Sequence, residues 1–229
     1  MNVQEMHLAF KIGVDKVDSL NYPDFQPNEI DFLLNQSQER FVKQRYGLNN
    51  TKGKSFESDQ KRTDDLRAVI KNSIIKPLTY DSNNNISVNA RFAQLPSDYW
   101  FAVNERVDLE SLDCNGKTVT SVGFVRVINH DNFNIIEDDP FEEPTKDKVV
   151  RLMIGNNAEL ISANGVNIIN YRLRYLRRPI GMNIDTNINC ELADHTHNEI
   201  VNGAVLIALE TIESKRTSSF LSVEKNNEE

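Results

Sequence analysis

The chain lacks the features of membrane and secreted proteins. No window of its 229 residues approaches the roughly 18 consecutive apolar residues of a membrane span. The opening residues, Met1 to His7, lack the basic start and apolar stretch of a secretory signal, which indicates synthesis in the cytoplasm. The two cysteines, Cys114 and Cys190, are too few for a disulfide framework and could pair only if the fold brought them together.

The chain also lacks a basic excess and catalytic motifs. Its net charge of -8 argues against binding nucleic acid through the phosphates, although an acidic protein can line a passage for DNA because like charges keep the polymer from sticking. There is no glycine-rich phosphate loop, no Gly-x-Ser-x-Gly elbow and no His-Glu-x-x-His. We therefore expect no enzyme activity, no catalytic residues and no cofactor.

Helical patterns occur at both ends of the chain. Apolar residues at spacings of three and four predict helices over residues 3–17, 27–46 and 197–216, with Pro27 in the first turn of the second. A further short helix is expected before Pro77, with Leu66, Val69 and Ile70 as its apolar edge. The apolar residues on one face of each helix are too few to stabilise that helix alone. We therefore expect the helices from the two ends of the chain to pack together.

The middle of the chain alternates between apolar and polar residues. Ile86 to Phe92 alternate with period two, and similar short runs at 99–103, 118–128, 149–154 and 168–176 are separated by asparagine and glycine turns. No helical pattern intervenes, which favours an antiparallel sheet or small barrel. The predicted fold class is α+β: a helical bundle of residues 1–76 and 190–216, an inserted antiparallel β-domain of residues 77–189, and a flexible tail of residues 217–229.

Two oppositely charged segments are candidate interfaces. The acidic segment carries five carboxylates in seven residues without the calcium-loop spacing, and we interpret it as a solvated loop or a contact for a basic neighbour: Glu137, Asp138, Asp139, Glu142 and Glu143. Arg172 and Arg174 share one face of the last predicted strand, with Arg177 and Arg178 just beyond and Tyr171 and Tyr175 on the opposite face. A solvated face and a charged interface both fit the arginines.

Two other features have competing interpretations. His195, His197 and Glu191 are residue types that bind zinc, but Asp194 and Thr196 beside them are typical helix caps, and capping is favoured. In the tail, Phe220, Leu221 and Val223 are the large apolar residues of a polar segment, so they are a candidate partner contact.

The order of these parts resembles a known family of phage proteins. The segments on which the resemblance rests are Glu29 to Val42, Leu95-Pro-Ser-Asp-Tyr-Trp100 and the closing helix Asn198 to Arg216. They are similar to the head-to-tail adaptors of tailed bacteriophages, of the tail tubular protein A type, and the many asparagines resemble the ring or neck proteins of crAss-like phages.

The resemblance implies a structural virion protein made in the host cytoplasm. It implies a ring, expected to be dodecameric, that joins the portal and other neck or tail proteins, and a channel that DNA traverses without sequence-specific binding. It implies no membrane contact, metal or catalytic residue. The alternatives from the residues are a metal-dependent hydrolase built on His195, His197 and Glu191, and a monomeric binding module.

Overall fold

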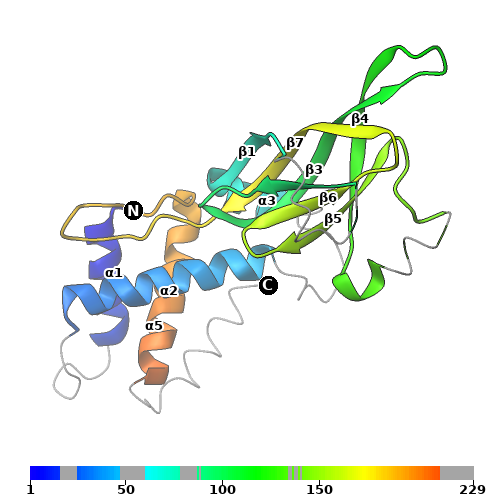
Figure 1. Ribbon diagram of the computed structural model, residues 1–229. Helices are drawn as coiled ribbons and strands as arrows, with labels where there is room; N and C mark the ends of the chain where they lie inside the picture. The colour runs from blue at the N-terminus through cyan, green and yellow to red at the C-terminus, as the bar shows by residue number, and fades with distance from the viewer. Residues whose placement is uncertain are drawn as a thin grey trace. The chain divides into compact units, whose positions relative to one another are not determined.

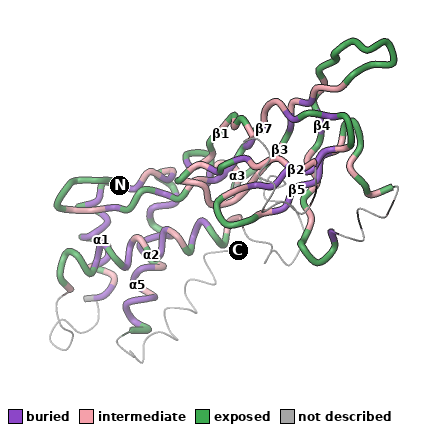
Figure 2. The backbone as a smooth tube through the Cα atoms, viewed as in Figure 1, coloured by how far each residue is buried: buried purple, intermediate pink, exposed green. Residues whose placement is uncertain are grey.

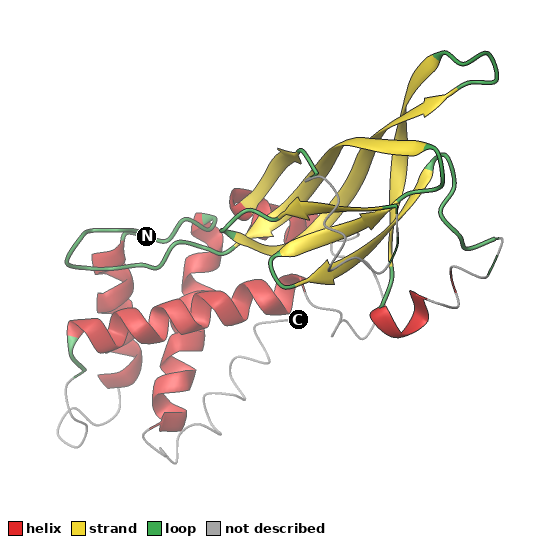
Figure 3. Ribbon diagram, viewed as in Figure 1, coloured by secondary structure: helices red, strands yellow, loops and turns green. Residues whose placement is uncertain are grey.

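The computed structural model describes residues 1–15, 25–46, 60–77, 87, 89–133, 136, 139 and 141–211. Helices and a seven-stranded sheet make up this part, so the expected α+β class is confirmed (Figures 1 and 3). The chain divides into two compact units, Met1–Val69 with Arg178–Glu229, and Ile70–Arg177. Within the described ranges, no helix combines the length and apolar content needed to cross a bilayer.

The first unit contains three long helices from opposite ends of the chain. They are α1 (Val3–Asp15), α2 (Pro27–Tyr46) and α5 (His197–Thr211), and α5 packs against both of the others. Phe10, Ile30 and Ile200 of their predicted apolar stripes are buried. Figure 2 shows buried stretches along all three helices. The approach of α2 and α5 is close, because a Cβ added at Gly203 would lie 2.5 Å from the Ser37 hydroxyl oxygen.

The predicted helix before Pro77 is only partly correct. The chain forms α3 (Gln60–Leu66) and a 3₁₀ turn η2 (Arg67–Val69), and then becomes strand β1 (Ile70–Ile75). β1 pairs antiparallel with β7 (Val166–Arg177), Ile70 lying opposite Leu176. The β-branched Ile70, Ile74 and Ile75 suit a strand, and pairing with β7 decides between the two conformations.

The sheet of the second unit has the strand order β1-β7-β3-β4-β5-β6-β2. The remaining strands are β2 (Ala90–Gln94), β3 (Tyr99–Leu112), β4 (Thr118–Val127), β5 (Lys148–Ile154) and β6 (Asn157–Ile161). The expectation of a fully antiparallel sheet is wrong, because β4 pairs parallel with β5. Parallel neighbours need a long crossover connection, which residues 128–147 with the 3₁₀ turn η3 (His130–Asn132) supply.

β4 extends past its neighbour β5 and forms a hairpin with the end of β3 (Figure 1). The pairing of β3 with β7 ends at Ser111, and that of β4 with β5 covers only Phe124 to Val127. Leu112 and Val119 are exposed in this hairpin. In the described part of the chain, β4 therefore has a free edge before Phe124.

The core of the second unit lies on the inner face of the sheet. Val107, Leu109, Tyr171, Leu173 and Tyr175 belong to its main cluster. Gly123 of β4 lies in this layer, where an added Cβ would meet Leu109 at 2.5 Å and the backbone oxygen of Asp147 at 2.9 Å. The outer face is thereby left for the polar residues of the same strands.

Candidate subunit interface

Alternation along β7 places the predicted arginines on two different faces. Arg172 and Arg174 are exposed on the outer face, while Tyr171 and Tyr175 are buried in the core. The same alternation places Arg177 with the tyrosines. Only two of the four predicted arginines therefore share the outer face.

Strand register aligns the outer-face residues into a row across four strands. Arg172 lies opposite Ile74 of β1 and Arg106 of β3, and Arg106 lies opposite Phe124 of β4. Directly opposite residues of antiparallel strands share a face. We call Ile74, Arg172, Arg106 and Phe124 the arginine row. It has two cations in the centre and an apolar side chain at each end, Ile74 and Phe124 each being 68% exposed.

The arginines exposed on the outer face are incompletely neutralised. The Arg172 Nε lies 2.9 Å from a carboxylate oxygen of Asp108, and Asp108 also accepts a hydrogen bond from Asn170. Arg174 donates through Nε to the amide oxygen of Asn72 at 2.9 Å, which is a neutral acceptor. Arg106 is exposed and has no ion-pair partner among the described residues. Like charges directly opposite each other on a sheet are unfavourable, so this pairing favours an added anion.

A hollow of about 480 Å³ lies over these residues. Its lining includes Arg106, Arg172, Arg174, Asn72 and Asn104. The guanidinium groups suit carboxylates, which they bind with two parallel N–H donors. The hollow is thus a candidate site for an acidic polypeptide segment.

Of the predicted acidic segment, Glu137 and Asp138 lie outside the described residues. Asp139 accepts backbone hydrogen bonds from Glu142 and Glu143 through its carbonyl oxygen, at 2.9 and 2.8 Å. Glu142 forms an ion pair with Arg126 of β4, and Glu143 is exposed. We call Asp139 with residues 141–143 the acidic turn, which these bonds hold beside β4.

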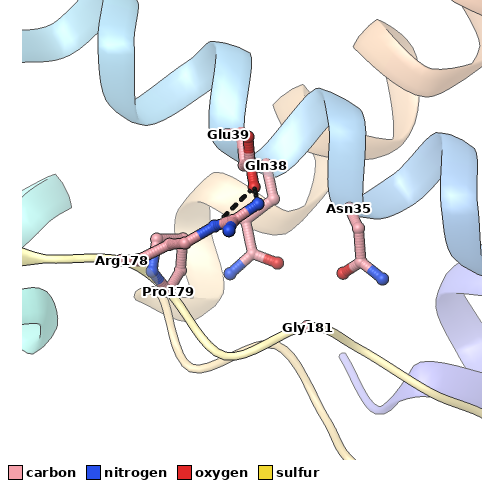
Figure 4. A pocket seen from close by; sticks show the side chains of 6 residues that line it. All are labelled: Asn35, Gln38, Glu39, Arg178, Pro179 and Gly181. Carbon is pink, nitrogen blue, oxygen red and sulfur yellow. Dashed lines mark hydrogen bonds and ion pairs between the residues drawn. The ribbon is translucent and has the colours of Figure 1, made fainter. Parts of the chain in front are cut away.

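The fourth arginine belongs to the helical unit. Arg178 donates through Nε to Glu39 of α2 at 2.9 Å, beside a hollow of about 400 Å³ (Figure 4). One turn earlier, the Asn35 amide exchanges two hydrogen bonds with the backbone of Met182. Gln38 lies between them, is 1% exposed, and neither atom of its amide has a hydrogen-bond partner within the described ranges. The segment after β7 is therefore held to α2 by Asn35 and Glu39, while Gln38 contributes no bond.

The three residues of the alternative zinc site have separate partners. His195 Nε2 lies 2.6 Å from Asp65, His197 Nε2 lies 3.0 Å from the carbonyl oxygen of Leu192, and Glu191 accepts from the backbone of Ile180. In the described part of the chain, no group of three or more His, Cys, Asp or Glu is placed to hold a metal. The geometry gives the hydrolase alternative no support.

The predicted caps of the last helix are wrong. A 3₁₀ turn η4 (Asp194–Thr196) precedes α5, and the turn has no side-chain cap. The Asp194 carboxylate lies 3.2 Å from the amino group of Met1, and the Thr196 hydroxyl donates to the carbonyl oxygen of Ala193. The apolar tail residues Phe220, Leu221 and Val223 lie outside the described residues.

The inner face of the sheet contains a buried ion pair. Arg151 Nη2 of β5 lies 2.8 Å from Glu105 of β3, and both side chains are buried. Burial raises the pKa of Glu105 above its ordinary value, although Arg151 opposes this shift. Burial also raises the pKa of the Tyr171 hydroxyl, and the negative charge of the nearby Glu105 adds to this shift. The pair is enclosed in the core, so its role is structural.

Both cysteines are free. Cys114 is exposed in the β3–β4 turn and Cys190 is buried in the helical unit. Burial raises the pKa of the Cys190 thiol to about 11, which keeps it protonated near neutral pH.

Three members of the row escaped prediction from sequence. Ile74 falls in the helix predicted before Pro77, Arg106 lies beyond the predicted strand 99–103, and Phe124 is an ordinary member of the predicted strand 118–128. The strand register that aligns them depends on segments far apart in the chain. The local signal available was the alternation of Arg106 and Phe124 with buried or small neighbours.

One family model and two individual proteins are similar to most of this chain. The family model described as phage tail ring protein 3/4 matches residues 1–219. "Ring protein 4/5" of Bacteroides phage crAss001 is 28% identical over 213 residues, covering 87% of this chain and 82% of that protein. "Ring protein 3" of the same phage is 30% identical over 199 residues, covering 78% of this chain and 81% of that protein.

Proposed function

Since the chain belongs to the phage tail ring protein 3/4 family of crAss-like phages, we propose that it is a structural subunit of a closed ring in the phage tail. The observation that carries the proposal is the family match over residues 1–219. It covers both compact units, so the relationship includes the whole described fold.

The surface of the chain supports assembly with other subunits. A ring of identical subunits uses two different surfaces that complement each other head to tail. The second unit presents cations in the arginine row and carboxylates in the acidic turn. The first unit exposes Leu8 and Ile12 of α1 and Phe32 of α2, large apolar residues that a neighbouring protein could cover.

The proposal also includes the size of the ring, its partners and the role of each part of the chain. The ring is dodecameric and joins the portal to the tail, continuing the channel for DNA. The helices of both chain ends act as one bundle, the β-domain is inserted between them in the sequence, and residues 217–229 act as a tail. The chain is not an enzyme, and DNA passes through without sequence-specific binding, as the net charge of -8 favours.

The mass of the purified protein tests the proposal. Native mass spectrometry and negative-stain electron microscopy would be applied to the chain alone and after mixing with portal and other tail proteins. We expect closed rings of about twelve copies, because a closed heterologous interface gives one defined stoichiometry. A chain that stays monomeric in every mixture and is absent from purified virions would contradict the ring function.

A further inference from the structure

The acidic turn exposes an aromatic side chain. Phe141 is 90% exposed, although it lies in a turn whose backbone is held by several bonds. The backbone N–H of Phe141 donates to the Asp139 carboxylate at 2.9 Å, and Lys148 donates to the Phe141 carbonyl oxygen at 3.0 Å. The phenyl ring is therefore presented to solvent by an ordered turn and flanked by carboxylates, a combination that suits an apolar, basic surface.

The arginine row has the complementary properties. Arg106 lacks an ion-pair partner among the described residues, just as Glu143 of the acidic turn does. Ile74 and Phe124 add exposed apolar surface on either side of the cations. A phosphate backbone would match the cations but leave these apolar ends without a partner, so the row fits an acidic polypeptide with an aromatic residue better.

The positions of the two surfaces suit contact between copies. The acidic turn lies beside β4, to which Glu142 is linked through Arg126. The row runs from β4 across β3 and β7 to β1, the edge strand of the sheet. Adjacent strands are about 4.8 Å apart, so Ile74 lies roughly 14 Å from β4. A copy displaced along the strand order could bring its acidic turn to the β1 end of its neighbour.

We propose that the acidic turn of one copy binds the arginine row of the next copy, with Phe141 as its apolar anchor near Ile74 and Glu143 paired with Arg106. This inference rests on the proposed ring function and names the contact between neighbouring subunits. Aromatic anchors contribute much of the binding energy of such contacts, while the ion pair sets register.

Disulfide trapping in assembled rings tests this contact. Phe141→Cys and Ile74→Cys would be combined in one chain with Cys114→Ser, which removes the exposed native thiol. Oxidation should give a ladder of covalent oligomers beyond the dimer. The matched control combines Phe141→Cys with Ile180→Cys, an exposed isoleucine outside every surface proposed for assembly, and should give no ladder.

Charge reversal provides an independent measurement. Arg106→Glu should raise the concentration needed for ring assembly about fivefold, as expected for one exposed charge pair, and Glu143→Arg in the same chain should restore part of the loss. Lys117→Glu in the β3–β4 turn is the control for a change of net charge. Its assembly should stay close to that of the wild type.

Several outcomes would overturn the inference. Rings that form normally but give no ladder would refute the contact and leave the ring function intact. A covalent dimer without longer products would show a symmetric pairing that cannot close a ring. Duplex DNA binding that Arg106→Glu abolishes, without any ladder, would reassign the row to DNA. If no ring forms under any condition, the proposed function and this contact both fail.

Discussion

At the scale of single residues, the buried Arg151–Glu105 pair dominates the electrostatics of the sheet core. Removing two charges from water is costly, and their attraction offsets this cost only while both are present. The raised pKa of Glu105 means that the folded state binds a proton more tightly than the unfolded state. Stability should therefore decrease as pH rises from about 4.5 through the raised pKa.

The first prediction concerns loss of the cation from this pair. Arg151→Met should lower the free energy of unfolding by about 3–5 kcal/mol at pH 8, because it leaves a buried carboxylate without a partner. At pH 5 the loss should be smaller, because the carboxyl group is then more often protonated. Urea denaturation at both pH values measures the difference.

The double variant and an exposed pair provide the controls. Glu105→Leu combined with Arg151→Met should recover most of the stability and remove the pH dependence. Arg172→Met, which breaks a pair with Asp108 whose cation is exposed, should cost less, about 1 kcal/mol. Equal losses for Arg151→Met and Arg172→Met would show that the buried pair has no special role.

At the scale of elements, the helices were predictable from sequence and the sheet only in part. Apolar spacing predicts α1, α2 and α5 because each helix needs just one buried stripe. β1 was taken for helix, because Leu66, Val69 and Ile70 share a spacing that both conformations can use. β6 (Asn157–Ile161) was missed because it is short and follows β5 after only the Gly155 turn, whose φ is 55°.

The arginine row depends on strand pairing, so it could be predicted from the sequence only in part. Alternation correctly placed Arg172 and Arg174 together on β7. It could not show that Arg106 and Phe124 continue the same row, since register between distant strands has no local signal. Nor could it show that Arg178 leaves the strand to bond Glu39.

The second prediction concerns the contact of α2 with α5. Gly203→Ala should lower the free energy of unfolding by up to about 2 kcal/mol, because the new methyl group meets the Ser37 hydroxyl and the steric cost exceeds the gain in helix propensity. Adding Ser37→Ala removes the colliding oxygen and should return stability to within about 1 kcal/mol of the wild type. Thermal and urea unfolding of the three variants measure both effects.

A glycine outside the helix contact is the matched control. Gly181→Ala places its methyl group 3.5 Å from Asn35, an ordinary contact, so its stability should change by less than about 0.5 kcal/mol. If Ser37→Ala does not rescue Gly203→Ala, the helices are not held at this distance by the Gly203–Ser37 contact.

At the scale of the whole molecule, the proposed ring function depends on surfaces that a single copy leaves uncovered. The arginine row, the acidic turn and the exposed residues of α1 and α2 all lie on a chain whose relatives are ring proteins. Such surfaces reduce the solubility of a free subunit and gain stability when covered. We therefore expect assembly to be more sensitive than folding to changes at these positions.

The third prediction concerns the segment after residue 216. Deleting residues 217–229 should leave the thermal unfolding of the subunit unchanged and weaken its incorporation into rings or portal complexes. The apolar residues are the expected cause, so replacing Phe220, Leu221 and Val223 by serine should reproduce the deletion. Replacing Glu224, Glu228 and Glu229 by glutamine is the matched control and should have little effect.

Quantitative mass spectrometry of assembled particles measures this incorporation. Normal levels of the truncated chain would show that the segment is dispensable for assembly. A lower melting temperature would instead assign it to the fold of the subunit.

The packing of α1 and α2 on α5 has a consequence for protein synthesis. α5 is translated after the whole sheet, so the first two helices leave the ribosome long before their partner exists. The sheet unit, Ile70–Arg177, can fold in the meantime because its contacts are internal. Nascent chains then display α1 and α2 without their partner until α5 is made, and we expect subunits to become competent to join a ring only after that point. Translation of α5 after the sheet thus delays assembly until the helical unit can close.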